Sequence, residues 1–523
     1  MKKKTVLILV VIILIQTITR VYFGFKKEYF HMDEIYSYGL MNYDKLNIAD
    51  NYDFLNKWHD KSYYKDYIQI NSNEKFNIKP VYENQKNDVH PPLYYLLLRI
   101  SSSFSIDNFS KWTGILLNIV IFIVSSIFVF LIAKILFKNP IYALLTCLIN
   151  GFTIISLNCS LYIRMYELCN LNILIITYLH LRIYNKEKLS ITNILGISFF
   201  IILGGLTHYY YFIYVIALYM LYLVKCMKTR RYKNLIIYNI GVFMAAGVYL
   251  AIFPYAISHI LFSYRGVFVE VSYIKNFFGY LLKINKDFFN YLLPFFIFII
   301  FIINLRKEDG NKNDIKENNK EETKIKKLKL DKRINLILIP ILTYFIIVIA
   351  KAPYIETRYI MPIHSILTIV IIYLSKFIIN KNLDNKSTLF ITTLLFLIII
   401  YSPIITRTNL EFTYTKYNSI AKRIEERDLP IIYIFNTGEN RILDDLYLFT
   451  LVDKSIVLDY NNLKENNYSK LIDVKDEIDD FILICNNGVN EETVKSVING
   501  EYQYMQRMNA CNIYEVKGNE NNV

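Results

Sequence analysis

The chain has 523 residues, of which 54% are hydrophobic, and its net charge at pH 7 is +14. Several apolar runs reach roughly 20 residues, the length that crosses a bilayer, and they exclude an ordinary soluble domain. Most of the cations lie between these runs, so we attribute them to membrane topology and to anionic lipid head groups rather than to nucleic acid.

The apolar runs predict a polytopic α-helical membrane protein. The first run follows three lysines and is interpreted as a retained helix, because the residues after it offer no small-residue cleavage site for a signal peptidase. Eleven transmembrane helices are expected, at residues 5–24, 112–137, 141–158, 168–184, 192–207, 209–226, 235–258, 288–305, 334–350, 359–379 and 388–405.

The basic loops predict the orientation of the chain in the plasma membrane. Loops on the cytoplasmic side of a membrane protein carry an excess of lysine and arginine. The N-terminus is therefore expected in the cytoplasm and the C-terminus outside it. Residues 306–333, rich in Lys, Glu and Asn, are expected to form a cytoplasmic linker. The loops assigned to the cytoplasm contain Lys134 and Lys138, Lys186 and Lys188, and residues 225–233, 306–333 and 376–386.

The first outer loop, residues 25–111, carries two acidic motifs. Asp33 and Glu34 follow the first helix, and Asp88 and His90 precede a proline pair that suits the first turn of a helix. Carboxylates at a membrane surface are costly to desolvate, so their placement points to function.

Residues 406–523 are mostly polar and are expected to form a small extracytoplasmic α/β domain. The short apolar runs at 431–435 and 481–484 are typical of buried strands. Cys485 and Cys511 lie in this region, and the sequence leaves open whether they form a disulfide.

Three further turns on the expected outer side carry polar and aromatic side chains: Arg164 with Tyr166, His208, and Arg358 with Tyr359. Arginine neutralises phosphate through paired hydrogen bonds, and a carboxylate can act as a general base or hold a divalent cation. Structural explanations stay open at this point. The arginines could extend to lipid head groups, and Glu356 could simply pair with Arg358.

The order of these motifs resembles that of the GT-C membrane glycosyltransferases. The likeness is to glycosyltransferase family 39, which includes protein O-mannosyltransferases and lipid A aminoarabinose transferases. It covers residues 1–405, which would form the transmembrane catalytic domain. The motifs that carry it are Asp33-Glu34, His90-Pro91-Pro92-Leu93-Tyr94-Tyr95, Arg164-Met165-Tyr166, Thr207-His208-Tyr209 and Arg358-Tyr359-Ile360-Met361-Pro362.

The resemblance implies a polyprenyl-phosphate-linked sugar as donor, inverting transfer, and an acceptor that is a lipid, a protein or a wall polymer. Asp33 would be the general base or an orienting carboxylate. Glu34 and Asp88 would complete the catalytic set. A divalent cation, if used, would be held by Asp33, Asp88 and His90. The residues expected to contact the substrates are His90, Arg164, Tyr166, His208, Arg358 and Tyr359.

Two other functions fit a chain of this composition. A transporter or flippase for lipid-linked sugars should show paired halves and polar or broken helices near the membrane midplane, and neither is evident. A cell-surface polysaccharide polymerase would share the topology but would lack the two acidic motifs. A receptor is disfavoured, because eleven spans exceed what an anchor needs.

Overall fold

A computed structural model of the protein describes most of the chain. Most of the expected helix 388–405, half of the expected helix 288–305 and most of the linker 306–333 lie outside the described residues. Those residues are 3–42, 53–262, 272–294, 331–349, 352–380, 410–414, 417–436, 442–509 and 511–518, with a few isolated positions between them.

Six helical segments among the described residues are long and apolar enough to cross a membrane. A seventh would be the pair α8 (Pro140–Phe152) and α9 (Ile154–Leu161), which is bent by 58° at Thr153. The six are α1 (Lys3–Lys26), α7 (Lys111–Phe137), α12 (Tyr210–Lys228), α13 (Tyr232–Ile252), Lys332–Ile349, which contains α17 (Asn335–Tyr344), and Thr357–Ile379, which contains most of α18 (His364–Asn380).

The number of spans among the described residues, six or seven, is therefore smaller than the eleven expected. The segment α10 (Tyr166–Ile183) begins next to a glutamate and ends with His180 and Arg182, so it is not uniformly apolar. The segment α11 (Ile191–Gly205) has 15 residues, which is short for a full crossing. The expected spans 288–305 and 388–405 are only partly described, the first over half of its residues and the second over fewer.

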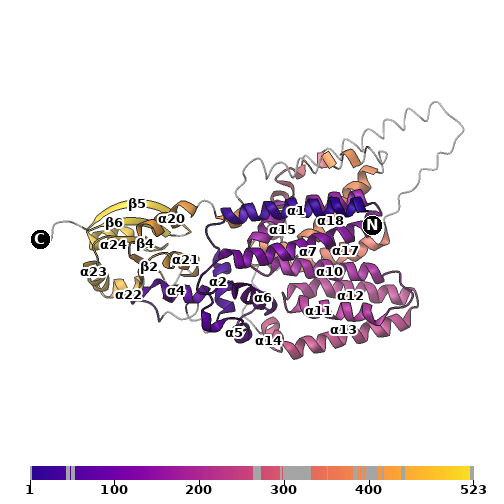
Figure 1. Ribbon diagram of the computed structural model, residues 1–523, viewed down its shortest axis with the longest axis horizontal. Coiled ribbons are helices and arrows are strands. Elements are labelled where there is room, and N and C mark those ends of the chain that lie inside the picture. Colours follow the sequence, from indigo (N-terminus) through magenta and orange to yellow (C-terminus); the bar gives the residue numbers. More distant parts are fainter. Residues whose placement is uncertain are drawn as a thin grey trace.

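The long helices lie side by side, with the start of α1 at the end of the bundle away from the β-sheet (Figure 1). The exposed face of α1 is apolar, whereas Gln16 and Arg20 are fully buried. Arg20 donates to the hydroxyls of Ser156 and Ser160 on α9, at 2.7 and 2.8 Å. Polar groups buried between helices need such partners, and these bonds fix α1 against α9.

Short helices of the first outer loop lie between the bundle and the sheet (Figure 1). The last of them begins directly after the proline pair and buries Tyr94, Tyr95 and Leu98. These helices are α2 (Met32–Met41), α4 (Lys61–Ile68), α5 (Lys79–Asn87) and α6 (Leu93–Ser102).

A six-stranded sheet of order β1-β3-β2-β4-β6-β5 forms one end of the molecule (Figure 1). Its first strand comes from the first outer loop, so residues far from 406–523 complete this sheet. The pairs β2–β3 and β2–β4 are parallel and the others antiparallel. The strands are β1 (Trp58–Asp60), β2 (Ile431–Phe435), β3 (Lys454–Asp459), β4 (Phe481–Cys485), β5 (Glu501–Met508) and β6 (Cys511–Lys517).

The two runs expected as strands coincide with β2 and β4, whose side chains are all buried. Cys485 and Cys511 are both free thiols. The helices that accompany the strands are α20 (Asn418–Arg427), α21 (Leu446–Phe449), α22 (Tyr460–Glu465), α23 (Ser469–Asp476) and α24 (Glu491–Ile498).

Candidate active site

The carboxylate of Asp33 is the meeting point of three distant segments. Its Oδ2 accepts a hydrogen bond from Nη1 of Arg358 at 2.5 Å and from the hydroxyl of Tyr162 at 2.8 Å. The side chains of Asp33 and Arg358 are 15% and 16% exposed, so the pair is shielded but can still be reached from outside. The Glu356–Arg358 contact expected as an alternative also forms, at 3.5 Å.

The start of α2 holds Asp33 in place. His31 caps the helix, because its Nδ1 accepts from the backbone N–H of Asp33, and the carboxylate of Glu34 accepts from the N–H of His31. This reciprocal capping satisfies N–H groups that have no partner within the helix. The first turn is thereby fixed with Asp33 directed toward Arg358.

Glu34 faces away from that pair and is fully buried. One carboxylate oxygen accepts from the ammonium of Lys27 at 2.9 Å, and the other accepts from the backbone N–H of Ile163 at 2.8 Å. Lys27 also donates to the carbonyl of Phe412 at 2.7 Å. Glu34 thus ties the helix α2 to α1 and to the Tyr162–Arg164 segment.

Removing one partner of this buried ion pair should destabilise the protein strongly. The variant Lys27→Met leaves the carboxylate of Glu34 uncompensated, at a cost of about 3–5 kcal/mol. The double variant Lys27→Met/Glu34→Gln should recover part of that loss. Thermal unfolding in detergent measures both, and equal melting temperatures of the single and double variants would contradict the pairing.

The second acidic motif is joined to the first through Arg164. Nδ1 of His90 lies 2.6 Å from Oδ2 of Asp88, and Nη2 of Arg164 lies 3.3 Å from Nε2 of His90. Because arginine only donates, these partners assign the proton to Nδ1 of His90, which donates it to Asp88. The other Arg164 nitrogen, Nη1, donates to the carbonyl of Asp33 at 3.3 Å and to the hydroxyls of Ser37 and Tyr95 at 3.1 Å.

Nearby cations keep both aspartates ionised. Burial alone would raise the pKa of Asp33, but Arg164, His31, Arg358 and the hydroxyl of Tyr162 together hold that pKa well below its usual range. Burial is likewise outweighed at Asp88, mainly by His90, whose Nδ1–H donates to the carboxylate, and the pKa of Asp88 is also lowered. Both carboxylates are therefore negative at neutral pH.

Aromatic rings line one side of the site. The ring of Tyr162 stacks on Phe412 with centroids 4.0 Å apart and on Tyr166 with centroids 5.7 Å apart. The ring of Tyr166 lies 5.8 Å from His208. The ring of Tyr359 lies beside the guanidinium of Arg358, at 5.4 Å. Of the expected site residues, Tyr166 therefore stacks on Tyr162, His208 lies next to Tyr166, and Tyr359 lies next to Arg358.

His208 should make the protein sensitive to acid. Burial, together with the neighbouring His90 and Arg164, lowers the pKa of His208 from 6.5 to about 3. Below pH 6.5 His208 becomes protonated in the unfolded chain but stays neutral in the folded chain. The free energy of unfolding is therefore unaffected by this group above pH 6.5 and is about 2 kcal/mol lower at pH 5. The variant His208→Gln should lose less thermal stability than the parent between pH 7.5 and pH 5. Equal losses in the two proteins would count against the buried neutral imidazole.

The described residues hold no group of three His, Cys, Asp or Glu side chains arranged to bind a metal ion. Asp33, Asp88 and His90, which would hold a divalent cation if one is used, bond to Arg358, Tyr36 and Arg164 among others.

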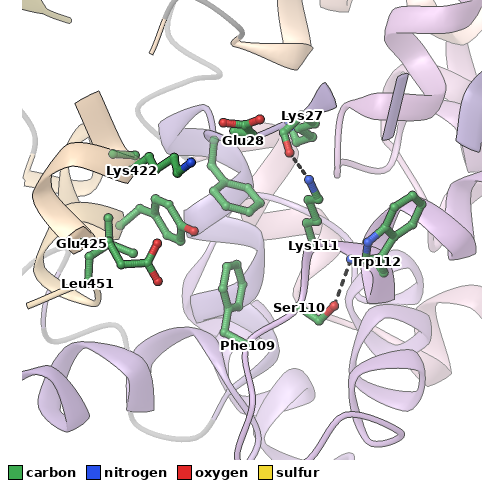
Figure 2. Close-up of a pocket in the computed structure, with 12 residues that line it drawn as sticks. Lys27, Glu28, Phe109, Ser110, Lys111, Trp112, Lys422, Glu425 and Leu451 are labelled. Carbon is green, nitrogen blue, oxygen red and sulfur yellow. Dashed lines mark hydrogen bonds between the residues drawn. The ribbon is translucent and has the colours of Figure 1, made fainter. Parts of the chain in front are cut away.

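A separate pocket of about 490 Å³ lies where the bundle meets the sheet domain. Figure 2 shows Lys111 and Trp112 from the start of α7 on one side and Lys422 and Glu425 from α20 on the other. Asp33, Arg164 and Arg358 do not line it. Lys27 does, and the bond from its ammonium to Glu34 links the pocket wall to the helix that carries Asp33.

Several residues of the site were missed in the sequence. Tyr162 lies two positions before Arg164, and its proximity to that motif was the only available signal. Lys27 resembles an ordinary interfacial lysine. Tyr95 belongs to the recognised helix start, but its bond to Arg164 depends on the packing of α6.

Comparison with known proteins agrees with this architecture. Residues 89–259, which contain His90, Arg164 and His208, match the family model of dolichyl-phosphate-mannose-protein mannosyltransferases. The crystal structure of ArnT from Cupriavidus metallidurans bound to undecaprenyl phosphate has a TM-score of 0.53 at 8% identity, covering 98% of each chain. ArnT in the apo state has a TM-score of 0.49 at 8% identity, covering 92% of this chain and 95% of that chain. A search of curated proteins gives no match.

The two likenesses cover different features of the chain. The family match includes the His90 and Arg164 motifs, and the likeness to the fold of ArnT covers 98% of the chain. The chain is therefore similar to the dolichyl-phosphate-mannose-protein mannosyltransferases over residues 89–259, and its fold is similar to that of ArnT over nearly its whole length.

Proposed function

We propose that the protein transfers a sugar from a polyprenyl phosphate carrier to an acceptor on the outer face of the membrane, with inversion at the anomeric carbon. The observation that carries the proposal is the Asp33–Arg358 pair, an ionised carboxylate and a guanidinium held together in a partly exposed site. The undecaprenyl phosphate bound to ArnT supports a donor of this class.

The two arginines have different parts in this proposal. Arg164 is 2% exposed and its Nη1 already donates to three oxygens, so it positions Asp33 and His90. Arg358 is more accessible, and a phosphate that enters the site competes with Asp33 for its guanidinium. Arginine binds phosphate through two parallel hydrogen bonds, which makes Arg358 the residue that receives the leaving group.

Transfer then follows from the redistribution of charge. Once Arg358 turns to the phosphate, Asp33 loses one of the cations that depress its pKa and becomes a stronger base. Asp33 takes the proton of the acceptor hydroxyl while that oxygen forms a bond to the anomeric carbon. The bond from that carbon to the phosphate oxygen breaks on the opposite face, and its electron pair leaves with the polyprenyl phosphate. Arg358 stabilises the negative charge that develops there.

Release of free polyprenyl phosphate tests this function. The protein is purified into lipid nanodiscs and supplied with a panel of polyprenyl phosphate sugars and a membrane extract as the source of acceptor. Time-dependent release that requires both donor and extract is expected. If no donor is consumed, and the protein in sealed vesicles instead moves the donor across the bilayer, a transporter replaces the glycosyltransferase.

A further inference from the structure

The segment that leads to Arg358 is hydrogen-bonded to the helix α15 (Tyr273–Phe289). Nδ2 of Asn276 donates to the carbonyls of Ile349 and Ala352 at 3.1 and 2.9 Å, and the hydroxyl of Tyr280 donates to the carbonyl of Tyr354 at 2.9 Å. Between them, Gly279 lets the chain approach closely, since a Cβ there would lie 2.5 Å from the side chain of Ile355.

Near its C-terminal end, α15 also contacts Thr357, the residue before Arg358. Oδ2 of Asp287 accepts a hydrogen bond from the hydroxyl of Thr357 at 2.7 Å. Asp287 is 1% exposed, and its Oδ1 has no hydrogen-bond partner among the described residues. Burial raises the pKa of Asp287 from 3.8 to about 6, so at neutral pH it is a buried anion. Such a group lowers stability, and its presence behind the turn that carries Arg358 calls for a functional reason.

The opposite face of α15 is apolar and exposed. Helical spacing places Ile274, Phe278, Leu281 and Leu282 on the side of α15 away from Asn276, Tyr280 and Asp287, with Phe277 toward the edge of that side and Tyr273 at the start of the helix. Each is 38–73% exposed, and α15 is not among the six segments that can cross the membrane. An amphipathic helix of this kind in a membrane protein lies in the interface, with its apolar face in lipid. The exposed residues are Tyr273, Ile274, Phe277, Phe278, Leu281 and Leu282.

We propose that α15 is an interfacial helix that positions Arg358. Its exposed apolar face contacts membrane lipid. Its buried polar face holds Thr357 through Asp287 and so keeps Arg358 next to Asp33. Lipid is the occupant because a surface of six large apolar side chains is unfavourable in water, at about 25 cal/mol for each Å². The role of Arg358 in turnover rests on the proposed function. The claim that α15 holds the turn of Arg358 in place is independent of that function.

The buried polar face is tested with matched substitutions at Thr357. The variant Thr357→Val removes the hydroxyl, and Thr357→Ser keeps it. Hydrogen exchange of residues 352–359 in nanodiscs should be faster in Thr357→Val, with exchange in the helical bundle unchanged, and should match the parent in Thr357→Ser. Release of polyprenyl phosphate should fall about tenfold in Thr357→Val only. Parent-like exchange in Thr357→Val overturns the positioning role, even if no donor is ever turned over.

Asp287→Asn separates charge from hydrogen bonding. Asparagine still accepts from Thr357, so hydrogen exchange of residues 352–359 should stay near that of the parent. Since the pKa of Asp287 is raised from 3.8 to about 6, ionisation of Asp287 lowers stability progressively between pH 4 and pH 6, and the full loss is present above that window. The variant should therefore melt at a higher temperature than the parent at pH 8, with a smaller difference at pH 4. A lower melting temperature at pH 8 contradicts the buried anion.

The exposed apolar face is tested by fluorescence quenching. The variant Phe278→Trp places an indole on the exposed face of α15, and Ile472→Trp places one on α23 of the sheet domain, where Ile472 is 42% exposed. Brominated phosphatidylcholine in the nanodisc should quench the added emission of Phe278→Trp by about half and should spare that of Ile472→Trp. Unquenched emission from Phe278→Trp overturns the lipid contact, and a dimer that hides this face would show the same result.

Discussion

Asparagine in place of Asp33 should lower the release of polyprenyl phosphate by about 10³-fold or more without unfolding the protein. The change removes the group that takes the acceptor proton, a contribution typically worth 10²–10⁴-fold. It also leaves Arg358 without its strongest partner, so the guanidinium is no longer held ready for the phosphate. Initial rates with saturating donor measure the effect.

The matched control for this variant is Asp473→Asn, which makes the same change at an exposed position on α23. Its rate should equal that of the parent. If Asp33→Asn keeps the parent rate while its melting temperature is unchanged, Asp33 has no part in proton transfer.

Loss of the Arg358 cation should have a comparable effect. The variant Arg358→Met should reduce turnover by about 10²–10³-fold, because a fixed positive charge at the leaving phosphate is removed. Arg358→Lys should retain part of the rate, since lysine supplies the charge without the paired hydrogen bonds. The comparison of kcat between the two variants isolates the geometric contribution.

Arg333 offers a control for Arg358. It is also paired with an aspartate, since its Nε and Nη2 donate to Asp331 at 3.1 and 2.6 Å, but it lies at the start of the segment Lys332–Ile349 and outside the site. Arg333→Met should leave turnover unchanged. Equal losses in Arg333→Met and Arg358→Met would mean that the effect comes from general damage to the helices.

The sequence predicted those helices whose signals are local, and it grouped four polar side chains that the structure also brings together. Long apolar runs mark α1, α7 and α13, and the order of the motifs brought Asp33, His90, Arg164 and Arg358 into one hypothesis. Their contacts in the structure agree with that grouping. The number of spans was not predictable from apolar length alone, because α11 is short.

The parts that escaped prediction depend on direction and distant packing. Asp33 and Glu34 are adjacent, yet successive residues of a helix point about 100° apart, so one faces Arg358 and the other the buried Lys27. The strand β1 joins a sheet whose other strands begin more than 350 residues later. Asp287 carries no motif, and only the packing of α15 brings it to Thr357.

The most direct measurement is a cryo-electron microscopy structure of the protein in nanodiscs with bound polyprenyl phosphate. The proposed mechanism predicts the phosphate within about 3 Å of the Arg358 guanidinium, with Asp33 released from that pair and open to an acceptor. A phosphate bound elsewhere, for example at Lys111 and Lys422 in the pocket of Figure 2, with Arg358 still on Asp33, would contradict it.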